Sequence, residues 1–128
     1  MSALNLTLIA TGGALGATSR YMVTIFCNYF FKTGFPISTL IVNLFGCFLM
    51  GMIINIFSHI WKPEESIRLF LTVGFLSSFT TFSAFSFDAF TLIEKGQVLL
   101  GISYTLASIT LPFLGLILGY TIVLHLLS

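Results

Sequence analysis

The chain has 128 residues, of which 57% are hydrophobic and only 7% are charged, and its formal net charge is +1. Charged side chains make up about a quarter of an average soluble domain, so this composition excludes that class. It predicts instead an all-α integral membrane protein whose apolar side chains face the lipid bilayer. We expect a multi-pass protein of the cell inner (plasma) membrane and no nucleic-acid partner.

Four apolar runs divide the chain, and each exceeds the ~20 residues that a helix needs to cross the hydrocarbon core. We expect spans at about residues 4–31, 37–61, 66–94 and 97–127, which form one four-helix transmembrane domain over residues 1–128. No basic leader precedes the first run, so we expect this span to be retained. Charges, prolines and glycines at residues 32–36, 62–65 and 95–96 separate the spans.

Apart from Arg20, which lies too deep in the first span to count, basic residues are shared equally between the two ends of this predicted bundle. An even number of spans places both termini on one side together with Lys62 and Arg68, and it places Lys32 and Lys95 on the other. The positive-inside rule therefore favours neither orientation. Either another signal orients the chain, or the chain inserts both ways. We favour dual topology, in which two copies form an antiparallel homodimer.

Small residues recur at helical spacing in three of the spans. The pairs four residues apart are Gly12 and Gly16, Cys47 and Gly51, and Gly115 and Gly119. Such pairs favour close helix packing but carry no functional information. Cys27 and Cys47 lie in apolar surroundings, which favours two buried small side chains over a disulfide or a metal site.

The centre of the third span is unusually polar. Six of the ten residues from Ser77 to Ser86 carry hydroxyl groups. Hydroxyls can bond back to carbonyls of their own helix, but so many at one membrane depth favour a helix broken near its middle. A break frees carbonyl oxygens, which bind cations, and amides, which bind anions. It is tolerated only where protein or water covers it.

Other residues in the spans fit an anion, although each also has a structural interpretation. Asn43 offers amide protons without a formal charge, or it joins two helices. Arg20 either draws anions into a vestibule or extends to the membrane interface. The positive edges of the Phe82 and Phe85 rings can attract a small anion, or these rings simply pack. Asp88 either pairs with Arg20 or faces the interface.

The sequence also argues against several functional classes. It contains no His or Cys cluster with metal-ligand spacing, no catalytic dyad within a span and no phosphate-binding glycine loop, so we expect no enzyme. A small multidrug exporter of dual topology is the main alternative, but it needs a carboxylate in its first span, and none is present. A non-transporting assembly subunit would not explain the polar third span.

Three motifs together resemble the Fluc (CrcB) family of fluoride channels over essentially the whole chain. They occupy residues 12–21 (GGALGATSRY), 38–46 (STLIVNLFG) and 80–86 (TTFSAFS). The resemblance implies a dual-topology, antiparallel homodimer with two pores, which exports fluoride passively and lowers its cytoplasmic concentration. The chain has Ser77 and Ser78 where this family commonly has a glycine pair, and Ala84 where it often has threonine.

The resemblance also implies roles for individual residues. Phe82 and Phe85 match the pair whose ring edges line the fluoride path, and Asn43 matches the pore asparagine. Arg20 matches the arginine of the aqueous vestibule. A structural sodium ion is implied on the dimer axis, held by the backbone carbonyls of two residues, Ser77 and Thr80. Polar residues that line the pore or stabilise the break in this family are matched here by Thr81, Ser83 and Tyr104. Ser108 lies one helical turn after Tyr104.

Overall fold

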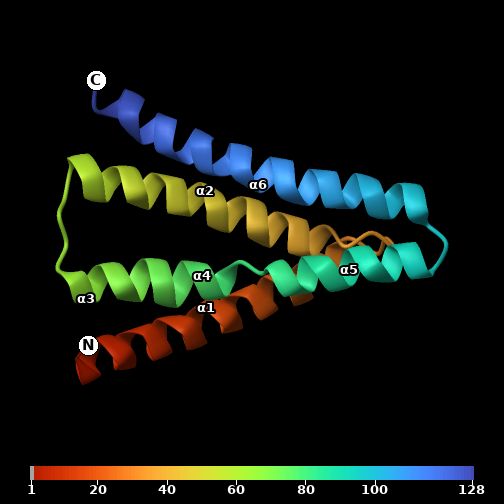
Figure 1. Ribbon diagram of the computed structural model, residues 1–128, viewed down its shortest axis with the longest axis horizontal. Coiled ribbons are helices and arrows are strands. Elements are labelled where there is room, and N and C mark those ends of the chain that lie inside the picture. Colours follow the sequence, from red (N-terminus) through yellow and green to blue (C-terminus); the bar gives the residue numbers. More distant parts are fainter. Residues whose placement is uncertain (1) are drawn as a thin grey trace.

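The computed structural model describes residues 2–128, which form helices joined by loops; Met1, the first residue of the predicted domain, lies outside them. The helices, in chain order, are α1 (Ala3–Phe30), α2 (Ile37–His59), α3 (Glu65–Arg68), η1 (Leu69–Leu76), α4 (Ser77–Phe79), α5 (Phe82–Glu94) and α6 (Val98–Leu126). Because α3, η1, α4 and α5 follow one another along one line, they form a third rod beside α1, α2 and α6 (Figure 1). Each predicted span therefore begins within two residues of the start of one rod and ends within two residues of the end of that rod.

Three rods are long and apolar enough to cross a membrane, namely α2, Glu65–Glu94 and α6. The chain is therefore a multi-pass membrane protein. Helix α1 has sufficient length, at 28 residues, but Arg20, two asparagines and several threonines make it more polar. A fourth crossing by α1 thus stays a prediction.

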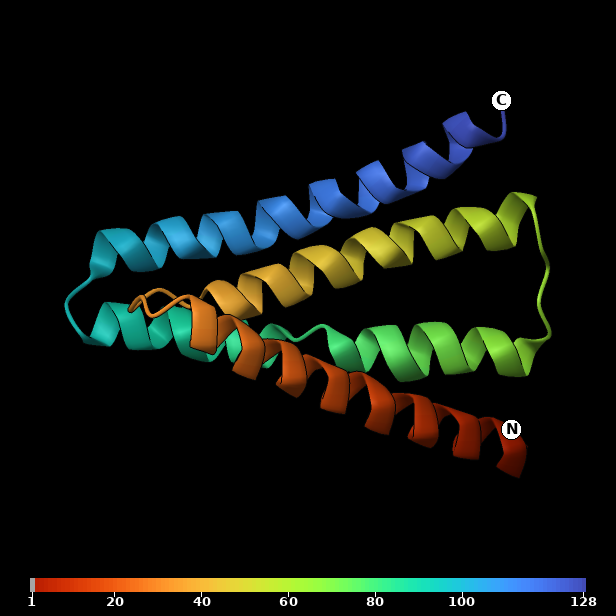
Figure 2. The same ribbon diagram turned by 180° about the vertical axis from the view of Figure 1, so that it is seen from behind.

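The rods alternate in direction along the bundle (Figures 1 and 2). Both termini and the α2–α3 connection lie at one end, and the connections from α1 to α2 and from α5 to α6 lie at the other. This is the arrangement expected for an even number of spans. It places Lys62 at the first end and Lys32 and Lys95 at the second.

Glycines allow two helix pairs to approach closely. Helix α1 packs against η1, and α2 packs along α6 in the most extensive contact of the bundle. A Cβ added to Gly16 would collide with the Phe75 carbonyl, and one added to Gly51 would collide with the Leu116 carbonyl. Since lipid is as apolar as the side chains, such close contact is a main source of association between membrane helices.

The third rod is interrupted between α4 and α5, which confirms the predicted break (Figure 1). Thr80 has φ −78° and ψ 157°, and Thr81 has φ −151° and ψ 122°, so both backbones are extended. Ser77 keeps right-handed helical angles, φ −67° and ψ −28°, and no non-glycine residue between 2 and 128 has a positive φ. Serines in place of a glycine pair therefore fit this backbone without strain.

The turns before the break widen into a π-helix over Leu69–Leu76. The Ser77 hydroxyl donates a hydrogen bond of 2.8 Å to the carbonyl of Thr72, five residues earlier, which matches this wider turn. π-Helical turns are rare and occur often at functional sites. No residue pattern in the sequence predicts this element.

Candidate ion-conducting site

Asn43 of α2 replaces the hydrogen bonds that the helix loses at the break. Its Nδ2 donates to the Thr81 carbonyl at 3.0 Å, and its Oδ1 accepts from the Thr81 amide at 2.7 Å. The side chain is buried, with 8% of its surface exposed. Because a buried backbone amide and carbonyl both need partners, this pair stabilises the extended segment. Asn43 keeps one further amide proton for another acceptor.

Arg20 approaches the same break from α1. Its Nε donates to the carbonyl of Ser78 at 3.2 Å, immediately before the helix ends. A cation at a helix C-terminus offsets the partial negative charge of the free carbonyls. Asp88, which sequence reasoning considered as a partner of Arg20, instead accepts hydrogen bonds from Thr39 and Tyr104.

Thr81 caps the first turn of α5 on the far side of the break. Its Oγ1 accepts from the Ala84 amide at 3.2 Å and lies 3.3 Å from the Ser83 Oγ. Within residues 2–128, the amides of Phe82 and Ser83 have no hydrogen-bond partner, as is usual for the first amides of a helix. These two donors and the positive end of α5 make this side of the break favourable to an anion.

The carbonyls before the break present the opposite charge. The Leu76 carbonyl accepts from the Thr80 amide and hydroxyl, both at 3.1 Å. In the described part of the chain, the Ser77 and Thr80 carbonyls accept no hydrogen bond, so they are free for another ligand. They are the two carbonyls for which the family resemblance implies a role in binding sodium.

A cavity of about 300 Å³ adjoins the break, between α2, α5 and α6. It brings together five residues of the predicted fluoride path, which are Asn43, Thr81, Phe82, Phe85 and Ser108. Thr80, Cys47, Ile109 and Pro112 complete its wall. We call this space the inner cavity. The sequence alone does not place Cys47 in this cavity, because the shared face of α2 and α6 follows only from their packing.

The two phenylalanines of the inner cavity have different environments. Their ring centroids lie 5.2 Å apart at an interplanar angle of 74°, so one ring presents its edge to the other. Phe85 is 6% exposed and Phe82 is 76% exposed. Phe85 therefore belongs to the packed interior, whereas Phe82 projects from this chain.

Tyr104 lies behind Phe85 and outside the inner cavity's wall. It is completely buried, and its ring centroid lies 5.8 Å from that of Phe85. Its hydroxyl donates to Asp88 Oδ2 at 3.2 Å, and Thr39 donates to the same oxygen at 2.7 Å. The structure thus makes Asp88 an acceptor that joins α2, α5 and α6. Ser83 also lies outside the cavity and is exposed.

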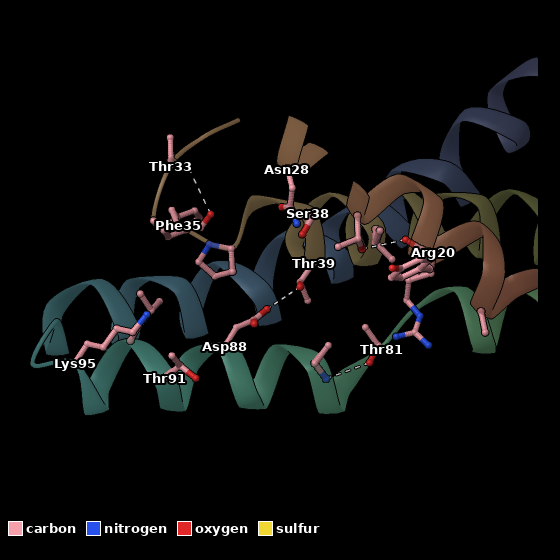
Figure 3. Close-up of a pocket in the computed structure, with 18 residues that line it drawn as sticks. Arg20, Asn28, Thr33, Phe35, Ser38, Thr39, Thr81, Asp88, Thr91 and Lys95 are labelled. Atoms are coloured by element: carbon pink, nitrogen blue, oxygen red, sulfur yellow. Dashed lines mark hydrogen bonds between the residues drawn. The ribbon is translucent and has the colours of Figure 1, made fainter. Parts of the chain in front are cut away.

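A larger cavity of about 580 Å³ opens between α1, α2, α5 and the loop after α1 (Figure 3). Arg20, Thr39, Asp88 and Lys95 line it, and the Arg20 side chain extends toward Thr81 (Figure 3). We call it the outer cavity. Thr81 lines both cavities, so both spaces reach the break. The predicted vestibule residue therefore lies in the larger of the two.

This fold and site define a multi-pass membrane protein with a helix whose break adjoins two cavities, each lined by both polar and apolar residues. The family model described as CrcB-like protein, Camphor Resistance (CrcB), matches residues 7–120. The chain belongs to the CrcB family, which confirms the family expected from the three motifs.

Relatives of the chain share most of its length. Proteins named fluoride-specific ion channel FluC include one from Rhodospirillum centenum, 38% identical over 90% of this chain and 91% of its own. Another, from Agrobacterium fabrum, is 41% identical over 91% of this chain and 96% of its own. A third, from Cereibacter sphaeroides, is 43% identical over 90% of each chain.

These names are those of ion channels, a class distinct from enzymes, and they agree with the non-enzymatic class expected here. Family membership and the apolar helices agree with the predicted place in the inner (plasma) membrane. They also separate the chain from small multidrug exporters, consistent with the lack of any Asp or Glu in α1.

Proposed function

We propose that this protein is a fluoride-selective channel that conducts fluoride passively and lowers cytoplasmic fluoride. The observation that carries the proposal is the inner cavity, where hydrogen-bond donors and aromatic rings surround one space beside a helix break. The printed names of the relatives, fluoride-specific ion channels, support the same ion.

A fluoride path must replace the water that this small anion holds tightly. The free proton of the Asn43 amide and the hydroxyls of Thr81 and Ser108 are suitable donors. The positive edges of the Phe82 and Phe85 rings add a weaker attraction. Arg20 raises the local concentration of anions in the outer cavity, because Arg20 and Lys95 together outweigh the one carboxylate of Asp88 there.

Two copies of the chain, inserted in opposite orientations, form the functional unit in this proposal. The exposed Phe82 ring and the open side of the inner cavity need a cover, which a second copy supplies. The equal distribution of basic residues between the two ends permits both orientations. Each copy then contributes one polar path, giving two pores per dimer.

The free carbonyls of Ser77 and Thr80 would hold the structural sodium ion. Carbonyl oxygens suit hard cations, and residues 2–128 contain no group of three His, Cys, Asp or Glu side chains that could hold a metal instead. One chain offers two such oxygens, and an antiparallel pair offers twice as many. A bound cation there would offset the carbonyl dipoles of both breaks.

Efflux from liposomes tests the function. Purified protein is reconstituted into potassium fluoride vesicles, and valinomycin carries the compensating potassium while an electrode records fluoride. We expect fast fluoride efflux, and we expect matched potassium chloride vesicles to retain their chloride. Equal efflux of both anions, or retention of both, would contradict the proposal.

A further inference from the structure

Lys95 lies at the opposite end of the outer cavity from the helix break. It follows the last residue of α5, whereas Thr81 precedes the first, and both line the cavity. At about 1.5 Å per residue, the 13 residues of α5 hold the two backbones about 20 Å apart. Figure 3 shows Asp88 between them and Arg20 near Thr81. The outer cavity therefore runs along α5, with one basic side chain toward each end.

The end of the cavity near Lys95 would repel anions without this side chain. A helix C-terminus carries about half a negative charge, and α5 ends here. The carboxylate of Asp88 lies further along the same wall. Its hydrogen bonds come from the hydroxyls of Thr39 and Tyr104, so no basic side chain pairs with it. An anion that enters from this end thus meets two negative groups before it reaches Arg20.

Arg20 is too distant to offset these groups at the entrance. It donates to the carbonyl of Ser78, beside the break. The Debye length is about 10 Å at 0.1 M ionic strength, so charges in contact with water are largely screened over the length of α5. Lys95 is the other basic residue that lines the cavity, and none of the hydrogen bonds drawn in Figure 3 involves its ammonium. Glu94, its neighbour in the sequence, lines neither cavity.

We propose that Lys95 controls the entry of fluoride into the outer cavity. Its charge offsets the negative end of α5 and the Asp88 carboxylate, so that a small anion enters from water faster than it would past those groups alone. This inference rests on the proposed function. It assigns separate tasks to the two basic residues of the cavity, because Lys95 acts on entry and Arg20 acts at the break.

Lys32 provides a matched control for Lys95. It lies at the same end of the bundle and carries the same charge, but it lines neither cavity. Lys32→Gln and Lys95→Gln therefore change the net charge, and the balance of basic residues between the two ends, by equal amounts. An effect on insertion or orientation should appear in both variants, whereas an effect inside the outer cavity should be specific to Lys95.

Single-channel conductance in planar bilayers tests the inference, because it does not depend on how many channels insert. Fluoride currents are recorded in sodium fluoride at about 0.1 M on both sides, with and without about 1 M sodium isethionate, which shortens the Debye length to about 3 Å. We expect Lys95→Gln to lower the conductance about two- to fivefold without the added salt, as loss of one charge a few ångströms from the ion in water would. Added salt should remove most of this difference from the wild type. Lys95→Arg and Lys32→Gln should match the wild type in both solutions.

The other results would contradict the inference in defined ways. Wild-type conductance in Lys95→Gln without the added salt would overturn it. An equal loss in Lys32→Gln, or a loss that added salt does not reduce, would also overturn it, because neither is an electrostatic effect of Lys95 within the cavity. In these cases the wild-type fluoride current persists, and the proposed function stands. If the wild type carries no fluoride current in either solution, the proposed function fails, and the inference fails with it.

Discussion

Asn43 combines two tasks at the centre of the molecule, because it holds Thr81 through two hydrogen bonds and also faces the inner cavity. Asn43→Ala should destabilise the protein by about 1–3 kcal/mol for each of the two Thr81 groups left unpaired. Thermal unfolding in detergent measures this loss. Asn5→Ala is the matched control, since the Asn5 side chain makes no hydrogen bond in the described residues. Equal melting temperatures for both variants would contradict the bridging role.

The exposures of Phe82 and Phe85 separate conduction from packing. Phe82→Ile should greatly reduce fluoride efflux, and it should lower the melting temperature less than Phe85→Ile does, because 76% of the Phe82 surface is exposed within one chain. Phe85→Ile should reduce both, since Phe85 packs against Tyr104. Efflux assays and thermal unfolding on the same preparations measure the two effects. Unchanged efflux in Phe82→Ile would leave its ring with a packing role only.

Several residues of the candidate site stand out in the sequence, and others do not, for a physical reason. Asn43, Phe82 and Phe85 were recognisable because a polar amide or a clustered aromatic pair stands out in an apolar span. The carboxylate of Asp88 was noticed, but its partner Thr39 lies 49 positions away in the sequence. Such a contact depends on how α2 and α5 pack, which no local pattern encodes.

At the scale of the helices, close backbone contact makes the bundle sensitive to single methyl groups. Gly51→Val should strongly lower the yield and stability of folded protein, because its side chain would meet the Leu116 carbonyl of α6. Gly34→Ala is the control, since no atom lies within 4 Å of a Cβ placed there. Size-exclusion chromatography and thermal unfolding compare the two. A well-folded Gly51→Val protein would contradict this packing.

The helices themselves differ in how far the sequence predicts them. Proline, glycine and charged residues mark the ends of the apolar runs. The ends of every predicted span therefore lie within two residues of the ends of the corresponding rod. The break was predicted from the polar segment between Ser77 and Ser86. The π-helix over Leu69–Leu76 was not, because its wider hydrogen bonds have no distinct residue pattern.

For the molecule as a whole, the balance of charge between its ends predicts two orientations in one membrane. Tags at the C-terminus should be protected in part of the population and accessible in the rest, because neither end dominates insertion. Adding two lysines to one terminus should shift the population toward a single orientation. A single orientation in the unmodified protein would contradict dual topology and the antiparallel dimer.

Sodium is the second prediction at this scale. Replacing sodium with a large organic cation should lower the thermal stability of the dimer, because a ligand that binds only the folded state stabilises it. The free carbonyls of Ser77 and Thr80 supply the expected site. Light scattering coupled to chromatography measures the dimer at each temperature. Identical dimer stability with and without sodium would remove the ion from the proposal.

The central claim is that fluoride itself carries the current through this protein. The most direct measurement is the reversal potential in a planar bilayer with fluoride graded tenfold across it and chloride equal on both sides. We predict a reversal potential near the fluoride equilibrium value, about 59 mV for a monovalent ion. A reversal potential near zero, or no protein-dependent current, would contradict fluoride-selective conduction.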